Sequence, residues 1–132
     1  MSGIDDGGDP NRFAEKRWPT EVRLKKAEKR LVITFDDGSE FSYPAEYLRV
    51  ESPSAEVQGH AANQKKTIPG RRHVGIMELE PVGRYAVRIK FDDLHDTGIF
   101  SWSYLYELGV DYDWRWQNYL DALEAHGLSR DP

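Results

Sequence analysis

The residues best suited to chemistry lie together in one short connection between two apolar segments. They are Asp92, Asp93, His95 and Asp96. A histidine flanked by carboxylates can hold a metal ion or act as an acid–base group. Aspartates in turns also accept hydrogen bonds from nearby backbone N–H groups, so a polar turn without chemistry is the first interpretation of this run. No second ligand follows at the helical spacing i, i+4, and a metal site therefore needs another histidine to approach in the fold.

Two functional alternatives depend on this run. One is metal-ion binding through His60, His95 and a nearby aspartate such as Asp93, with His73 as a further ligand. The other is a small enzyme centred on His95 and assisted by Asp92 or Asp93. The sequence contains no P-loop, no dinucleotide-binding glycine pattern and no G-x-S-x-G nucleophile turn. These missing motifs favour a protein that is not an enzyme.

The composition narrows the class of protein further. The chain has 132 residues, Lys+Arg 18 against Asp+Glu 23, a formal net charge of −5 and no cysteine. That length suits one domain, and without cysteine the chain forms no disulfide and no Cys-ligated zinc or iron–sulfur site. The acidic balance argues against nucleic acid as a partner, and no apolar run reaches the roughly 20 residues of a membrane span. We expect a cytoplasmic protein without a nucleic-acid or membrane partner.

The elements that must position the polar run can be predicted from the periodicity of apolar residues. Residues 1–17, rich in glycine, aspartate and charge, predict a flexible tail. Alternation of apolar and polar residues over 20–43, with an Asp-Gly turn at Gly38, predicts three antiparallel strands. Pro44 is suited to the first position of a short helix that follows. Strand patterning returns over 74–91 on either side of a Pro-Val-Gly turn.

The C-terminal third predicts helices. Ser101 is a suitable N-cap for a short helix, and apolar residues at i, i+4, i+7, i+8 and i+11 predict a longer one over 112–123. The fold class is therefore α+β. We expect an antiparallel β-sheet with a short helix after the third strand and C-terminal helices packed on one face. The domain spans 18–127, and a tail follows over 128–132.

Residues 51–73 are the least core-like internal stretch, since Val57 and Ile68 are its only sizeable aliphatic residues. Loops of this length are functional or disordered more often than not. The stretch also carries a basic patch made of Lys65, Lys66, Arg71 and Arg72. Such a patch can bind phosphates or acidic proteins, but a solvated mobile loop is the preferred interpretation.

Aromatic residues are frequent near the C-terminus. We expect Trp102 and Trp116 to be buried, because aromatics at helical spacing usually belong to the core. Trp114 and Tyr104 lie off the apolar stripe of their helices. They are candidates for an exposed contact surface, since aromatics are favoured at interfaces.

Four segments in order carry a family resemblance, namely Trp18-Pro19, 31–44, 48–60 and 95–105. Over about residues 18–109 the chain resembles the gamma-butyrobetaine hydroxylase-like N-terminal domain family, many of whose bacterial members are small stand-alone proteins of unknown function. The resemblance implies that the domain itself is non-catalytic. In the carnitine-pathway dioxygenases it precedes the catalytic jelly roll and binds a structural zinc through three cysteines and one histidine. Related domains are attached to P-loop ATPases that carry iron–sulfur clusters.

The zinc ligands of the family do not carry over to this chain. The cysteine positions fall on Ser52, Ser54 and Val57, and the histidine position falls on His95. Because a closed structural zinc site takes four nitrogen or sulfur ligands, we expect neither this zinc nor any other cofactor. The serine hydroxyls can instead hold the loop by hydrogen bonds. We expect His95 and His60 to approach the Ser52–Ser54 turn and to form one polar cluster with it.

The resemblance also implies a glycine immediately before His95, where this chain has Leu94, so the local turn is expected to differ. The preferred function is a non-catalytic interaction or accessory module, with iron–sulfur cluster assembly as a linked pathway. Its partner is an unidentified protein, and the chain is expected to be a monomer or a weak homo-oligomer. The candidate interaction residues are Arg49, Ser52, Ser54, Gln58, His60, His95 and Trp102.

Overall fold

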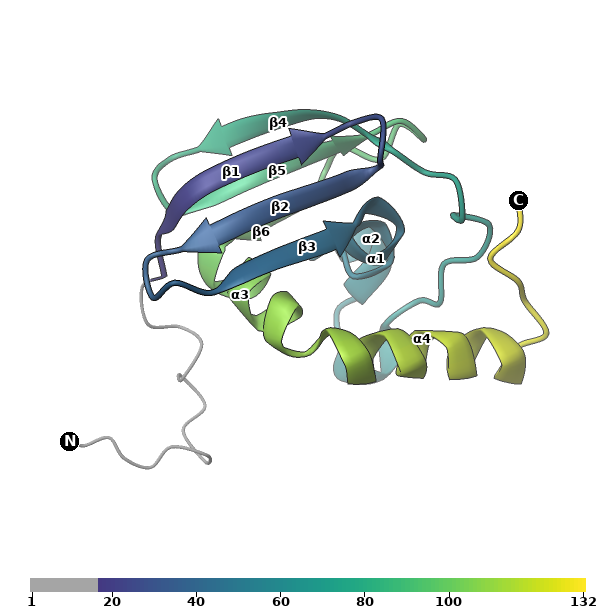
Figure 1. The fold of residues 1–132 in the computed structure, drawn as a ribbon. Coiled ribbons are helices and arrows are strands. Elements are labelled where there is room, and N and C mark those ends of the chain that lie inside the picture. The colour runs from purple at the N-terminus through teal and green to yellow at the C-terminus, as the bar shows by residue number, and fades with distance from the viewer. Residues whose placement is uncertain (1–16) are drawn as a thin grey trace, which may run out of the picture.

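The first half of the chain forms a three-stranded antiparallel sheet in a computed structural model that describes residues 17–132 (Figure 1). Its strands are β1 (Pro19–Lys25), β2 (Arg30–Phe35) and β3 (Glu40–Pro44). Strand β2 pairs with β1 on one side and β3 on the other, which confirms the predicted meander. The predicted tail over 1–17 lies outside the described residues except for Arg17.

A second three-stranded antiparallel sheet follows, built from β4 (Ile76–Val82), β5 (Ala86–Phe91) and β6 (Ile99–Ser101). The α+β class is confirmed, but the strands form two sheets where the sequence analysis described one. Apolar alternation shows which residues of a strand share a face, and it does not show which strands pair. The polar run of interest lies in the loop between β5 and β6.

The first helix and the two C-terminal helices begin where the sequence analysis places them, but two short helices also form in the stretch 51–73, for which a mobile loop was the preferred interpretation. Helix α1 (Ala45–Val50) follows Pro44 directly, and α2 (Ala55–Gln58) and the 3-10 helix η1 (Ala62–Gln64) lie within the polar stretch 51–73. Helices α3 (Trp102–Val110) and α4 (Tyr112–Ala125) close the fold. The Ser101 side chain caps α3, because its Oγ accepts a hydrogen bond from the Tyr104 N–H at 3.0 Å.

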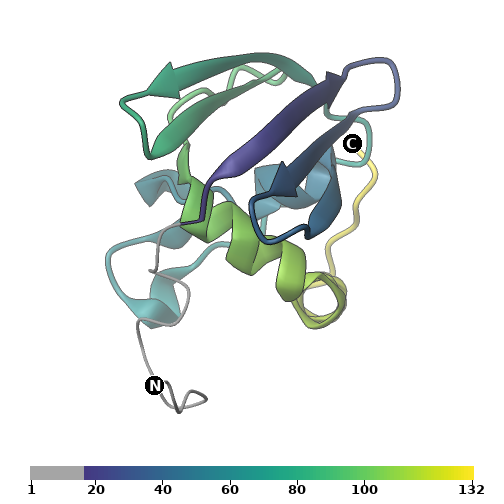
Figure 2. The same ribbon diagram turned by 60° about the vertical axis from the view of Figure 1, so that its left-hand side comes forward.

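The core lies between the two sheets and the helices beneath them. Alternate residues of β2 and of β5 are buried and pack together with residues of β3, β6, α1 and α3. A smaller cluster, made of Val50, Tyr119 and Leu123, joins α1 to α4. Figure 2 shows α3 and α4 on the same side of the sheets. In the part of the chain that the structure describes, no helix is long and apolar enough to cross a membrane.

The C-terminal residues 128–132 run back along the segment before β4. The Gly70 N–H donates to the Ser129 carbonyl at 2.9 Å, and the Arg72 N–H donates to the Arg130 carbonyl at 3.0 Å. Arg130 also forms two hydrogen bonds with the buried carboxylate of Glu46, at 2.9 and 2.7 Å. The segment assigned as a tail is therefore attached to α1 and to residues 70–72.

Candidate functional site

Two loops bring the polar residues of interest together. The loop after α1 carries Ser52 and Ser54, and the loop between β5 and β6 carries His95. The Nε2 atom of His95 lies 3.0 Å from Ser52 Oγ and 3.3 Å from Ser54 Oγ, and the two hydroxyls lie 3.3 Å apart. Ser52 is fully buried, and the His95 side chain is 8% exposed. We call these three residues the Ser–His cluster. The predicted approach of His95 to this turn is confirmed.

A left-handed turn positions the histidine. Leu94 has a φ of 75°, a conformation that costs a non-glycine residue roughly 1–2 kcal/mol, and its side chain is 85% exposed. The His95 N–H donates to Asp93 Oδ1 at 3.1 Å, and the Phe91 N–H donates to the His95 carbonyl at 3.0 Å. The turn thus forms without the glycine that the family resemblance implies, at the expense of backbone strain.

Gly98 closes the other side of the Ser–His cluster. A Cβ atom at this position would lie 2.4 Å from Ser52 Oγ and 3.1 Å from Cε1 of Phe100, and both distances are shorter than van der Waals contact. Only glycine therefore lets the β5–β6 loop lie directly over Ser52. This close approach excludes solvent from the serine hydroxyl.

Helix α2 contacts the cluster and the β5–β6 loop through two side chains, Gln58 and Glu56. Gln58 Nε2 donates to the Ser52 carbonyl at 2.9 Å, and the Thr97 hydroxyl donates to Glu56 Oε1 at 2.5 Å. This hydrogen bond from Thr97 holds the pKa of Glu56 below its ordinary value. Glu56 Oε1 also lies 3.8 Å from His95 Nδ1. Carboxylate, imidazole and hydroxyl thus follow one another in the order found in a catalytic triad.

Burial decides what this order of groups can do. Removal from water lowers the pKa of His95, and the nearby positive charge of Arg49 lowers it further, so the imidazole is neutral at neutral pH. A nucleophile must also touch its substrate, yet Ser52 has no exposed surface and lies beneath Gly98. An enzyme centred on His95 would need the β5–β6 loop to move away first. The geometry suits hydrogen bonding within the protein.

Asp93 is engaged by two arginines. Its Oδ2 atom accepts a hydrogen bond from Arg49 Nε at 2.8 Å and lies 2.7 Å from Arg71 Nε. Burial on its own raises the pKa of Asp93, but the hydrogen bond and charge of Arg49, with the charge of Arg71, hold it below the ordinary value. Asp93 therefore joins α1, through Arg49, and the segment that contains Arg71 to the β5–β6 loop.

The residues at the family's zinc-ligand positions do not fit zinc. Ser52 and Ser54 offer neutral hydroxyls, Val57 is a buried aliphatic side chain, and only His95 is an ordinary zinc ligand. The hydroxyls hydrogen-bond to the imidazole nitrogen that would face a metal. Within residues 17–132, no three His, Asp or Glu side chains form a group that could hold a metal ion.

The other sequence-predicted residues lie apart from the Ser–His cluster or beneath the surface. Contrary to the expectation, His60 does not join the hydrogen bonds of the Ser–His cluster: it is exposed, and its N–H donates to Gln64 Oε1 of η1 at 2.9 Å. Trp102 and Trp116, which were expected to be buried, are both half-buried, and the Trp102 Nε1–H donates to the Arg84 carbonyl at 3.2 Å. Arg49 is buried with the two serines.

One expectation about exposed aromatics is wrong and the other is confirmed. Tyr104 is half-buried, its hydroxyl donates to the Glu51 carbonyl at 2.7 Å, and burial raises its pKa. It faces inward because Phe100, Arg115 and the end of α1 surround its ring. Trp114 is 54% exposed and therefore remains available for contact.

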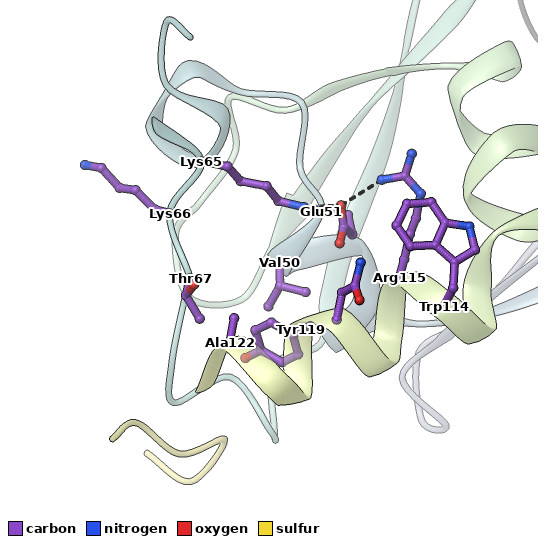
Figure 3. A pocket seen from close by; sticks show the side chains of 10 residues that line it. Val50, Glu51, Lys65, Lys66, Thr67, Trp114, Arg115, Tyr119 and Ala122 are labelled. Atoms are coloured by element: carbon purple, nitrogen blue, oxygen red, sulfur yellow. Dashed lines mark hydrogen bonds and ion pairs between the residues drawn. The ribbon is translucent and has the colours of Figure 1, made fainter. Parts of the chain in front are cut away.

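A surface pocket of about 270 Å³ lies beside Trp114, between α4 and the residues around Lys65 (Figure 3). The buried carboxylate of Glu51 forms ion pairs with Lys65 Nζ at 2.7 Å and with an Arg115 nitrogen at 3.1 Å. The sequence analysis singled out Trp114 and the basic patch separately. It did not predict that they lie close together, because Glu51 brings them together through Lys65 and Arg115, which lie 14 and 64 positions away from it in the chain.

The fold and the site together define a class: a small α+β domain in which two three-stranded antiparallel sheets share one core and a polar cluster joins two loops. The chain belongs to the gamma-butyrobetaine hydroxylase-like N-terminal domain family, whose model matches residues 22–106. The family resemblance is therefore confirmed. Among curated proteins, none matches this chain.

Seven chains of solved structures match this one, and three of them illustrate the similarity. Two are NMR solution structures; the first is 46% identical, with a TM-score of 0.77 over 88% of this chain and 91% of that chain. The second is 39% identical, with a TM-score of 0.77 over 98% of this chain and 92% of that chain. The third is a crystal structure of a protein of unknown function in the DUF971 family from Acidithiobacillus ferrooxidans. It is 36% identical, with a TM-score of 0.59 over 69% of this chain and 91% of that chain.

Proposed function

We propose that this protein is a non-catalytic accessory module of the cytoplasm that binds a protein partner. One observation carries the proposal: the groups most capable of chemistry, Ser52, Ser54 and His95, hydrogen-bond to one another at a buried position. They join the loop after α1 to the β5–β6 loop, as do Arg49 and Asp93. Polar side chains used in this way stabilise a shape, and a stable shape is what a binding module presents to its partner.

The first partner class to test is an ATPase or other factor of iron–sulfur cluster assembly. Support comes from the family resemblance, since related domains occur attached to P-loop ATPases that carry such clusters. The protein's own role in such an assembly is to recognise or position the partner, because it has no cysteine to ligate a cluster. We propose that it acts as a monomer or a weak homo-oligomer.

Affinity capture from the native host tests the proposal. The tagged protein serves as bait, and a tagged unrelated domain of similar size and charge is the control, together with a variant in which residues 60–66 are scrambled. We expect at least one protein to be enriched by the native bait and to bind it again in purified form with a stoichiometry near one to one. If purified candidates show no binding, the accessory role is wrong.

A further inference from the structure

The pocket beside α4 has an apolar floor and a charged rim. Val50, Tyr119 and Ala122 line its inner part, and Trp114 stands at one side with about half of its surface exposed. Figure 3 shows Lys65 reaching from the opposite side toward Glu51, while Lys66 extends outward at the rim. At about 270 Å³, the pocket is slightly smaller than those that hold drug-sized ligands, which begin at about 300 Å³. Its volume suits a single side chain or a similar small group.

The rim is cationic although the protein is acidic. Three of its side chains, Lys65, Lys66 and Arg115, are positive, and among residues 17–132 Glu51 is the only acidic residue that lines the pocket. The Glu51 side chain is only 4% exposed and is already paired with both Lys65 and Arg115. Arg115 is 15% exposed and also pairs with Glu107 and Asp111, so the exposed charge at the rim comes from Lys66 and from Lys65, which is 40% exposed although it pairs with Glu51.

Among the residues that line the pocket, positive charges outnumber negative ones, and on a protein of net charge −5 this favours an acidic partner at this place. At physiological ionic strength the Debye length is about 8 Å, so the charges at the rim outweigh the net charge of the distant surface. Complementary charge around an apolar contact is a common arrangement at protein interfaces. Trp114 adds a large apolar contact of the residue type most enriched among interface hot spots.

We propose that this pocket binds one apolar side chain of a partner protein, within a segment that carries acidic residues on both sides of it. The apolar side chain contacts Val50, Tyr119 and Trp114, and the flanking carboxylates pair with Lys65 and Lys66. This inference rests on the proposed accessory function and specifies where and how the partner is recognised.

A titration followed by NMR tests the pocket directly. The probe is an acetylated and amidated pentapeptide with a central leucine between two pairs of glutamates. We expect saturable chemical-shift changes at the backbone amides of Lys65 and Thr67 and at the Trp114 indole. A peptide with lysines in place of the glutamates should bind roughly tenfold more weakly, and so should one with glycine in place of the leucine. Absence of saturable shifts, shifts at another surface, or equal binding of the lysine peptide overturns the proposal.

A matched pair of α4 variants separates the pocket from the rest of the helix. Ala122 lines the pocket and Ala125 is exposed one turn away, and leucine is a good helix former at both positions. Ala122→Leu fills the pocket and should abolish peptide binding, whereas Ala125→Leu should bind as the native protein does. If Ala122→Leu still captures the native partner at full strength, the pocket assignment is wrong and the accessory function stands. If neither variant captures a partner, but the peptide binds Ala125→Leu and not Ala122→Leu, the accessory function is wrong and the pocket assignment stands.

Discussion

Burial determines the role of His95, although histidine is a residue type that can act in acid–base chemistry. In solution, an imidazole next to a carboxylate and a hydroxyl is a general base, and here the same three groups lie within hydrogen-bond or ion-pair range. Burial removes the substrate's access to Ser52 and lowers the pKa of His95. The neutral imidazole then serves as a hydrogen-bonding centre for two serine hydroxyls. Its contribution to stability depends on its remaining neutral.

The lowered pKa of His95 predicts a loss of stability in mild acid. Below the ordinary histidine value of 6.5, the unfolded chain binds a proton more readily than the folded protein. This contribution to the free energy of unfolding is complete above pH 6.5 and falls as the pH is lowered from there toward the folded-state pKa. Urea unfolding between about pH 5 and 7.5 measures the effect.

Two substitutions control this measurement. His95→Gln keeps a polar side chain near the serines but cannot titrate, so its stability should fall less over the same pH range. His126→Gln removes an exposed histidine at the end of α4 and controls for the substitution itself. A native protein whose free energy of unfolding stays constant or rises as the pH drops from 6.5 contradicts the assignment.

The strained backbone at Leu94 predicts that glycine is more stabilising than leucine at this exposed position. Relief of the left-handed strain gains roughly 1–2 kcal/mol, and the entropy of glycine costs roughly 0.5–1 kcal/mol. Leu94→Gly should therefore raise the free energy of unfolding, measured by urea titration, by about 0.5–1 kcal/mol. Asp96→Gly, in the same loop but without a positive φ, should lose stability. A loss of stability in Leu94→Gly as well would refute the strain argument.

The donor set at the Ser–His cluster predicts that cysteines can turn it into a metal site. The triple variant Ser52→Cys, Ser54→Cys, Val57→Cys adds three thiolates to His95, two of them at positions that contact it, and three cysteines with one histidine are a common structural zinc set. We expect about one zinc per chain by elemental analysis of untagged protein, and no stoichiometric metal in the native protein. A native protein that carries one equivalent of zinc or iron would contradict the fit argument. A zinc-free triple variant would show that Val57 lies too far from the other positions.

At the scale of the elements, α1 connects the parts of the molecule through buried charges. Glu46 and Arg49 of this helix and Glu51, the residue after it, are each less than 10% exposed, and each pairs with a different part of the chain. Glu46 binds Arg130 in the C-terminal segment, Arg49 binds Asp93, and Glu51 binds Arg115 of α4. A helix of 6 residues cannot hold its place by its own hydrogen bonds. These pairs, with the apolar contacts of Tyr47 and Leu48, fix its position.

Sequence reasoning predicted the short helix but not its role. Proline at its start and the end of the strand pattern indicated the helix, since both signals are local. Glu46, Arg49 and Glu51 gave no local sign of burial, because charged residues are usually exposed. Their partners Arg130, Asp93 and Arg115 lie 84, 44 and 64 positions away. The approach of His95 to Ser52 could be predicted only because both residues stand at positions that hold zinc ligands in the family.

Removal of the Arg130 side chain tests the attachment of the C-terminal segment. Arg130→Ala leaves the carboxylate of Glu46 buried without its two hydrogen bonds and also removes a guanidinium 5.3 Å from the Trp116 ring. We expect a loss of about 2 kcal/mol in the free energy of unfolding. Arg72→Ala removes an exposed ion pair in the same region and should cost about 0.5 kcal/mol or less. Equal losses in the two variants would indicate that Glu46 remains hydrated.

At the scale of the whole molecule, the two sheets have separate hydrogen-bond ladders but one core. Leu31, Ile33 and Phe35 from β2 and Ile89 and Phe91 from β5 belong to the same buried cluster. Helix α3 contributes Leu105 and Leu108 to it, and the Tyr43 hydroxyl donates to the Leu105 carbonyl at 2.6 Å. Gly109 lies so close to Phe41 that a Cβ there would be 2.4 Å from the ring. Neither sheet can therefore open without exposing the apolar face of the other.

This shared core predicts that both sheets unfold in one cooperative step. Leu105 of α3 is fully buried in this core, and Leu105→Ala should cost about 2–5 kcal/mol. Native-state hydrogen exchange followed by NMR should give the same loss of opening free energy for the Ile33 and Ile89 amides, because both exchange through global unfolding. Glu124→Ala, exposed on α4, should change neither. If the substitution lowers protection in one sheet and leaves the other unchanged, the sheets are separate cooperative units, and the rigid shape assumed for partner binding is limited to one of them.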